Sequence, residues 1–268
     1  MKTIRVYLLS LFITIIFLPS CDYETGIRDT DYPDQLLYMP AAYQNGRFVI
    51  DDITKVTGEL PFEGSIYRYK IDTENRLFIV PLSVYRAGID NKKEVNVDIS
   101  IDTDTVTSLN NSSSLGYSLL LLPEDKITIT DKVTIKDKEE IAIFDLKIDL
   151  DFLLSKFADQ NYGIGINISS KDREVNPKLA TTVVIINTRI MKPTSGFTYT
   201  INNKEVKFNN TAIYAEEYVW DFGDSSSSTE KSPTHTYVSP GKYKVSLTST
   251  GITGKTESSI YAEEIIIE

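Results

Sequence analysis

The chain of 268 residues has a single cysteine, a single histidine and a single tryptophan. Because Cys21 has no second cysteine to pair with, no disulfide forms within the chain, and each domain must be stable through its own apolar core. His235 has no second histidine to complete a pair, and no zinc motif, phosphate loop or nucleophile elbow occurs. Hydrophobic residues make up 41% of the sequence, enough for one or two cores of ordinary size.

Basic residues are scarce relative to acidic ones. The 28 lysines and arginines face 38 aspartates and glutamates, which gives a formal charge of −10. Residues 1–20 contain two basic residues, Lys2 and Arg5, and no acid, so the charge is −12 without them. An acidic chain is repelled by phosphate backbones, and we therefore expect no nucleic-acid partner.

The first 20 residues have the pattern of a secretory signal peptide. Lys2 and Arg5 precede an apolar run from Tyr7 to Phe17, which is too short for the roughly 20 residues that span a bilayer. The following Leu18–Cys21 segment resembles a bacterial lipobox. That resemblance implies cleavage before Cys21 and lipidation of Cys21, which would anchor the protein in the outer membrane, exposed at the cell surface.

Residues 21–35 are expected to form a lipidated tether, because this segment has too few apolar residues to bury. Its acidic residues are Asp22, Glu24, Asp29, Asp31 and Asp34. Acids directly after the lipidated cysteine resemble the surface-export signal of lipoproteins from Bacteroidetes-type bacteria. A merely solvated linker explains the same residues equally well.

From Leu36 onward the sequence has the pattern of short β-strands. Val95 to Ile101 alternates apolar and polar residues with period 2, and Tyr162 to Ser169 does so as well. About eight or nine such segments fall within roughly 150 residues, separated by turn signals. Strands with one apolar face must stack that face on a second sheet, so the pattern favours a β-sandwich over an α/β fold.

Several local signals refine this expectation. Asn45-Gly46 predicts a two-residue hairpin between the strands around it, and Pro81 marks an edge or a bulge in the apolar strand from Leu77 to Val84. Asp149 to Phe157 has helical spacing, with Asp149 or Asp151 as its cap. Asp104 to Gly116 is polar and predicts a loop or a short helix.

The C-terminal segment carries three motifs in fixed order: Tyr218–Asp224 (YVWDFGD), Ser232–Tyr237 (SPTHTY) and Pro240–Leu247 (PGKYKVSL). Together they resemble a polycystic-kidney-disease (PKD) domain, an immunoglobulin-like module of cell-surface proteins, over residues 196–268. Trp220 is expected in the core, with a sugar-stacking platform as the alternative, and His235 is expected to be structural. The family commonly has glycine where this chain has Ser225.

Residues 36–190 also resemble a family. Leu37–Pro40, Pro81–Gly88, Leu121–Lys126 and Thr181–Ile185 are laid out as in an N-terminal domain of unknown function found in Bacteroidetes surface lipoproteins of polysaccharide-utilisation loci. The resemblance implies an immunoglobulin-like sandwich, often placed between a lipid anchor and a glycan-binding or glycosidase domain. The predicted fold is therefore all-β, with two consecutive immunoglobulin-like β-sandwich domains after a lipoprotein signal peptide.

Acidic pairs are numerous, but an acidic surface produces them without any catalytic role. The pairs are Asp149 with Asp151, Glu139 with Glu140, Glu216 with Glu217, and Glu263 with Glu264. A glycosidase needs two carboxylates across a cleft, and nothing in the pattern singles out such a pair. We therefore expect no catalytic residues and no enzyme activity.

Candidate ligand-binding residues are few. Asp102-Thr103-Asp104, and Asp221 with Asp224, could supply oxygen ligands to calcium, but neither fits an EF-hand loop, and no metal or other cofactor is expected. Tyr43, Tyr117 and Tyr214 lie near predicted loops and could stack on sugars. Partly buried packing explains each tyrosine as well, so the binding residues stay unassigned.

These features together predict a non-catalytic surface lipoprotein that binds or helps to capture glycans in a polysaccharide-utilisation system. Its partners would be a glycan, the outer membrane through the lipid anchor, and an outer-membrane transporter or glycosidase. The alternative is a structural or adhesive protein whose sandwiches act as spacers or protein-contact modules.

Overall fold

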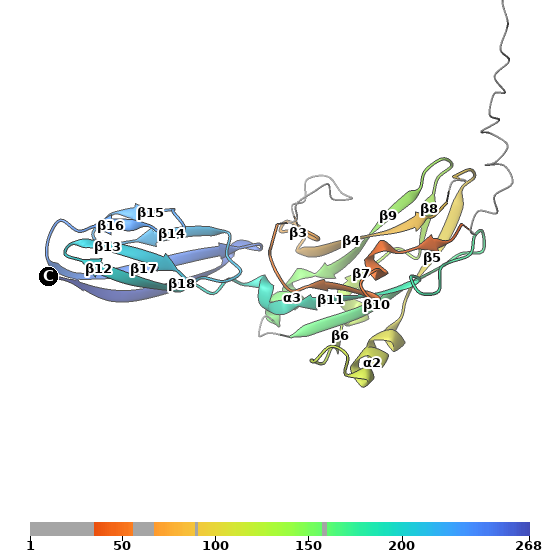
Figure 1. The fold of residues 1–268 in the computed structure, drawn as a ribbon, viewed down its shortest axis with the longest axis horizontal. Coiled ribbons are helices and arrows are strands. Elements are labelled where there is room, and N and C mark those ends of the chain that lie inside the picture. The colour runs from red at the N-terminus through yellow and green to blue at the C-terminus, as the bar shows by residue number, and fades with distance from the viewer. Residues whose placement is uncertain (1–34, 56–66, 89–90, 157–159) are drawn as a thin grey trace, which may run out of the picture. The chain divides into compact units, whose positions relative to one another are not determined.

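The computed structural model describes residues 35–55, 67–88, 91–156 and 160–268. Two separate hydrophobic cores lie in this part of the chain, one built from residues 37–191 and one from residues 197–267. Nearly all regular elements are strands, so the all-β prediction is confirmed (Figure 1). The predicted signal peptide, the tether and Cys21 lie outside the described residues.

The first core lies between two sheets. In the first sheet the strand order is β1-β4-β9-β7, with β3 also paired to β4, and in the second it is β2-β11-β10-β5-β8, with β6 also paired to β10. The strands of the first sheet are β1 (Leu37–Tyr38), β3 (Lys70–Asp72), β4 (Leu77–Arg86), β7 (Ile127–Thr128) and β9 (Ile141–Asp149). Those of the second are β2 (Arg47–Ile50), β5 (Val95–Ile101), β6 (Leu120–Leu121), β8 (Lys132–Ile135), β10 (Asn161–Ser169) and β11 (Thr181–Asn187).

Period-2 alternation determines which side chains enter this core. Along β5, Val95, Val97 and Ile99 are buried while Asp98 and Ser100 are exposed. Pro81 lies opposite Asp145 of β9; on the other edge of β4, β3 pairs at Leu77–Ile79 and β1 at Tyr85–Arg86. Among the described strands, nothing pairs with β4 opposite Pro81 on that side, which suits a residue without an N–H.

The predicted hairpin at Asn45-Gly46 is wrong. Both residues have positive φ, 54° and 72°, as a tight turn requires. However, the turn joins the 3₁₀ helix η1 (Pro40–Ala42) to β2, and β2 pairs in parallel with β11 rather than with β1. The two residues do form a turn, but the strand before it, β1, belongs to the other sheet.

Two α-helices accompany this sandwich. Helix α3 (Leu150–Ser155) is capped by Asp149, whose carboxylate accepts a hydrogen bond from the Phe152 amide at 3.0 Å, as predicted. Helix α2 (Thr103–Ser112) forms in the polar segment and packs beside β10 (Figure 1). A small apolar cluster around Val106 fixes it against the sheet. Short 3₁₀ helices occur at η2 (Glu124–Lys126) and η3 (Thr188–Met191).

The second core also lies between two sheets, with strand orders β12-β13-β16 and β15-β14-β17-β18. The strands are β12 (Phe197–Asn202), β13 (Glu205–Asn210), β14 (Glu217–Asp221), β15 (Ser227–Ser228), β16 (Thr234–Thr236), β17 (Gly241–Gly251) and β18 (Gly254–Ile267). Trp220 is fully buried at its centre, and its indole N–H donates to the Glu230 carbonyl at 2.9 Å. The core prediction for Trp220 is confirmed.

Candidate functional site

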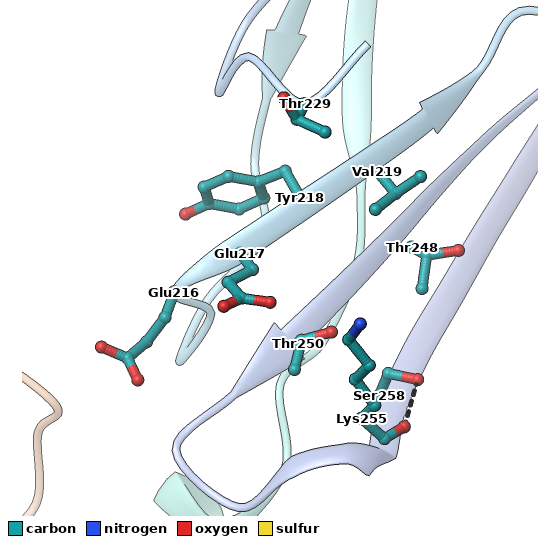
Figure 2. A pocket seen from close by; sticks show the side chains of 9 residues that line it. All are labelled: Glu216, Glu217, Tyr218, Val219, Thr229, Thr248, Thr250, Lys255 and Ser258. Atoms are coloured by element: carbon teal, nitrogen blue, oxygen red, sulfur yellow. Dashed lines mark hydrogen bonds between the residues drawn. The ribbon is translucent and has the colours of Figure 1, made fainter. Parts of the chain in front are cut away.

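An open pocket of about 620 Å³ lies on the outer face of the sheet that contains β14, β17 and β18 (Figure 2). Its walls combine hydroxyl, carboxylate and ammonium groups with a small aliphatic patch. The lining residues are Glu216, Glu217, Tyr218, Val219, Thr229, Thr248, Thr250, Lys255 and Ser258. This pocket is called the PKD-sheet pocket below.

The strand register places these side chains. Glu217 lies opposite Thr250, and Val219 lies opposite Thr248, on adjacent strands β14 and β17. Their neighbours Trp220 and Leu247 point to the other face, where both are fully buried. Side chains alternate between the two faces of a strand. Because Trp220 and Leu247 point into the second core, Glu217, Thr248 and Thr250 point to the solvent.

Three polar groups follow one another across the strands in Figure 2: the Glu217 carboxylate, the Thr250 hydroxyl and the Lys255 ammonium group. Within the described residues, neither Glu217 nor Lys255 belongs to a salt bridge, so both charges face solvent. The Ser258 hydroxyl donates to the Lys255 carbonyl at 2.9 Å, which fixes the turn below the pocket.

Tyr218 borders the pocket from the core-facing side of β14, where its ring packs against the second core. Its hydroxyl donates to the Ala215 carbonyl at 3.1 Å, and burial, together with the nearby Glu216 charge, raises the pKa of the phenol. The phenol therefore stays protonated at neutral pH and acts as a fixed hydrogen-bonding group.

This arrangement suits binding better than acid–base catalysis. A glycosidase places its two carboxylates on either side of the scissile bond, whereas Glu216 and Glu217 are consecutive at one side of the pocket (Figure 2). Lys255 and Ser258 lie on the other side. That the protein is not an enzyme stays a prediction.

His235 and its neighbours have the composition of a hydrolytic triad but not its geometry. The Nε2 atom of His235 lies 2.8 Å from Asp224 Oδ2 and 3.4 Å from Ser226 Oγ. A triad needs the acid and the nucleophile on different ring nitrogens, and here both use the same one. The ring also stacks on Phe222, with centroids 4.2 Å apart, so its contacts are those of the structural histidine predicted from the motif.

Three of the four acids suggested as calcium ligands, Asp102, Asp221 and Asp224, are engaged by the protein itself. Asp102 caps α2 by accepting hydrogen bonds from the amide and hydroxyl of Thr105 at 3.0 and 2.6 Å. Asp221 accepts from the Gly223 amide, and Asp224 from the Ser226 amide. In the described ranges, no three acids, cysteines or histidines group closely enough to hold a metal ion.

Asp224 has a shifted pKa. Its burial alone would raise the pKa of the carboxyl group, but hydrogen bonds from Ser226 and His235 outweigh burial and hold it below its ordinary value. The carboxylate is therefore charged at neutral pH and holds the turn that joins β14 to β15.

Other acid pairs have structural partners. Asp151 forms a salt bridge with Arg76 at 2.5 Å beside the helix cap Asp149. Glu264 pairs with Lys242 at 3.0 Å. These contacts agree with the surface role expected from the sequence. Of the four acidic pairs, only Glu216 with Glu217 lines the PKD-sheet pocket.

The three candidate tyrosines are not brought together. Tyr43 is 77% exposed and Tyr117 is 41% exposed, while Tyr214 is partly buried. The PKD-sheet pocket contains none of them. Cys21 lies outside the described residues, and no helix within the described ranges has the length and hydropathy needed to cross a bilayer.

Sequence reasoning missed Thr248, Thr250 and Lys255 as pocket residues. A signal for the threonines existed, because they alternate with Leu247 and Ser249 on a strand whose other face enters the core. The alternation predicts that they face solvent, but it does not reveal that Lys255 returns beside them on the next strand.

Comparison with known proteins adds the family context. A family model described as a "-like, N-terminal domain" matches residues 32–175, and a PKD-domain model matches residues 192–265. Both resemblances predicted from the sequence are thereby confirmed. The PKD resemblance was placed from Gly196 onward, and Gly196 lies just inside the range that the PKD model matches.

Similar proteins cover only parts of this chain or share little sequence with it. The pre-pro-metalloprotease PrtV of Vibrio cholerae is 26% identical over 142 residues, which are 50% of this chain and 15% of that protein. A solved carbohydrate-binding module of the β-sandwich superfamily is 32% identical over 28% of this chain and 34% of its own, with a TM-score of 0.26. A Bacteroides ovatus multidomain protein that includes DUF1735 is 15% identical over 70% of this chain and 59% of its own, with a TM-score of 0.35.

Proposed function

Because the chain belongs to the family defined by that N-terminal domain and carries a C-terminal PKD domain, we propose that it is a non-catalytic glycan-binding protein of the bacterial cell surface. The PKD-sheet pocket is the proposed binding site. The N-terminal sandwich would hold this site away from the membrane.

One observation carries the proposal: Glu217, Thr250 and Lys255 line an open pocket, and the two charged groups have no ion-pair partner in the described chain. Sugar hydroxyls both donate and accept hydrogen bonds, so a carboxylate, a hydroxyl and an ammonium group in one row match a polyol. Val219, half exposed at the floor, offers an aliphatic contact for the apolar face of a pyranose.

Retention in affinity electrophoresis tests the proposal. Residues 22–268 should be slowed by at least one polysaccharide in a broad panel, and Glu217→Gln should weaken that retention about tenfold, because a hydrogen bond to a charged group is lost. Glu264→Gln is the matched control, since Glu264 lies on the same strand system but pairs with Lys242 outside the pocket. A parent chain that no polysaccharide retains would contradict the proposal.

The anchor is part of the same proposal. Cleavage before Cys21 and lipidation of Cys21 would place the protein in the outer membrane, beside a transporter or glycosidase of a polysaccharide-utilisation system. The motif of residues 18–21 and the acidic segment behind it support this. Cys21→Ala should move the protein from the membrane to the soluble fraction, and continued detergent-resistant fractionation with membranes would contradict it.

A second candidate function is protein contact, with the sandwiches as spacers. The outer face of the same sheet exposes Val219 at 50%, Ile260 at 70% and Ile266 at 57%. Exposed apolar side chains on one sheet face are typical of interaction surfaces. Capture of an outer-membrane protein that Ile260→Ser abolishes, without glycan retention, would favour this function.

A further inference from the structure

The first sandwich contains another pocket, of about 320 Å³, at the end of β2 and beside the segment that leads into β3. Its volume lies at the lower end of the roughly 300–1,000 Å³ range of small-molecule sites. The lining residues are Val49, Ile50, Asp51, Asp52, Thr54, Lys55, Arg68 and Tyr69. It is called the Arg68 pocket below.

Arg68 is a half-buried cation that leaves most of its donors unused by the described part of the chain. Its guanidinium carbon lies 4.0 Å from the centroid of the Phe48 ring, and Nη1 donates to the Val49 carbonyl at 3.4 Å. No salt bridge to Arg68 exists within the described residues, and burial lowers the pKa of the guanidinium, against the opposing effect of the Asp51 charge. Stacking fixes the plane of the group and leaves further N–H donors for a ligand.

The two aspartates of the pocket differ in what they already bind. Asp52 accepts hydrogen bonds from the Ile53 amide, at 2.7 Å, and from the Thr54 hydroxyl, so both of its oxygens serve the turn. Asp51 is exposed and makes no hydrogen bond through its side chain in the described chain. Its carboxylate is therefore the acceptor that this pocket presents to a ligand.

Tyr117 lies outside this pocket. Its phenol is 41% exposed, and burial, followed by the Asp51 charge, raises its pKa against the opposing effect of Arg47. At the base, the Tyr69 ring is buried and stacked on Phe78, with centroids 4.8 Å apart. Tyr69 thus gives the pocket a rigid aromatic wall.

The charges of the pocket indicate the class of ligand. Among the described lining residues, Asp51 and Asp52 balance Arg68 and Lys55, so these side chains together carry no net charge, and a charged ligand would meet repulsion on one side. A pair of adjacent hydroxyl groups can donate to a carboxylate and accept from a guanidinium at the same time. Neutral sugars carry such pairs on a ring small enough for this volume.

We propose that the Arg68 pocket binds one residue of a neutral sugar, whose adjacent hydroxyls donate to Asp51 and accept from Arg68. The inference rests on the proposed function for its ligand class but assigns a different site in the other sandwich. Two sites on one chain would raise the apparent affinity for a long glycan through effective concentration.

Saturation-transfer NMR on residues 22–268 tests this, with the methyl glycosides of glucose, mannose and galactose as probes and methyl glucuronide as the charged comparison. The parent should bind at least one neutral glycoside, and Asp51→Asn and Arg68→Lys should each weaken that binding about tenfold. Glu264→Gln, which lies outside both pockets, should leave it unchanged. Thermal unfolding of each variant checks that the fold is retained.

The outcomes separate the two proposals. If Glu217→Gln abolishes glycoside binding while Asp51→Asn and Arg68→Lys do not, the Arg68 pocket is overturned and the proposed function stands. If only the glucuronide binds and Arg68→Lys removes it, the pocket is an anion site and the inference fails. If the parent binds no glycoside and no polysaccharide retains it, both proposals fail.

Discussion

The two sandwiches fill their cores with different kinds of side chain. Among the described residues buried in the first core, only four are aromatic: Tyr69, Phe78, Phe144 and Tyr162. In the second core half are aromatic: Phe197, Phe208, Trp220, Phe222 and Tyr237. These rings touch one another directly; for example, the Phe208 and Trp220 centroids are 5.2 Å apart.

The difference follows from size. A short chain has few positions that can be fully buried, and each aromatic side chain removes roughly 150–250 Å² from water, so a small sandwich gains most from rings. The longer first sandwich can rely on many Ile, Val and Leu side chains of its two sheets. The second core should therefore be more sensitive to the loss of a single residue.

The largest effect is expected from Trp220→Ala. Removing the fully buried indole should destabilise the second sandwich by about 3–5 kcal/mol, through lost burial and a cavity. Urea unfolding followed by circular dichroism measures it, because the substitution also removes the only tryptophan. Val219→Ala, at a half-exposed neighbour, is the control and should change stability by less than about 0.5 kcal/mol. An equal cost for both would contradict the aromatic-core argument.

Arg86→Met tests the first sandwich. This guanidinium is 3% exposed and donates to the carbonyls of Asn91 at 2.7 Å and Lys93 at 2.8 Å, and to those of Lys92, Lys136 and Glu139. The substitution removes all of these hydrogen bonds to a buried charged group and should cost about 3 kcal/mol.

The tryptophan makes this second test specific. Trp220 fluorescence reports only the second sandwich, so Arg86→Met should shift the unfolding transition seen by circular dichroism and leave the fluorescence transition in place. Arg76→Met, which breaks an exposed salt bridge, is the control and should cost at most about 1 kcal/mol. Fluorescence and circular dichroism transitions that move together would show that the two cores unfold as one unit.

Ser225→Gly should stabilise the second sandwich by about 0.5 kcal/mol. Ser225 has φ of 72°, a conformation that costs a non-glycine residue about 1–2 kcal/mol, partly offset by the greater chain entropy of glycine. The thermal midpoint by fluorescence measures the gain. Asn203→Gly, at φ of 54°, is the control and should gain less, because asparagine tolerates this region. A loss of stability would show that the Ser225 side chain stabilises the fold by more than its positive φ costs.

The smallest effect is expected from pH. The pKa of Asp224 is lower in the folded protein than in the unfolded chain, so its contribution to stability is present above about pH 4 and is lost as pH falls through the folded value. The fluorescence-detected midpoint of the parent should therefore fall on acidification. The midpoint should fall less steeply with pH in Asp224→Asn. Equal dependence on pH in the two proteins would contradict a lowered pKa of Asp224 in the folded state.

Much of the fold could be predicted because it depends on residues that are close together in the sequence. The alternation of β5, the cap at Asp149 and the YVWDFGD motif around Trp220 each depend on residues a few positions apart. The same local reading failed at Asn45-Gly46, where the turn was right but the pairing of β2 with β11 spans more than 130 residues. Helix α2 formed in a polar segment because Asp102 caps it and Val106 packs on the sheet.

The candidate sites were less predictable. The sequence presents Glu217 as one acid of a surface pair, and it gives no signal for Asp51 or Arg68. No pattern of neighbouring residues reveals that Lys255 lies across the strands from Glu217, or that Asp51 and Arg68 share a pocket.

The sequence alone determined that this protein is built of strands, that its stability needs no disulfide, and that its last 73 residues have the motifs of a PKD domain. Those properties follow from side-chain alternation and composition, which act over a few residues. Tertiary structure decided which strands share a sheet and which polar side chains meet in a pocket. The physical reason is that burying the apolar faces fixes the strand order, and the strand order then brings outward-facing groups together from distant parts of the chain.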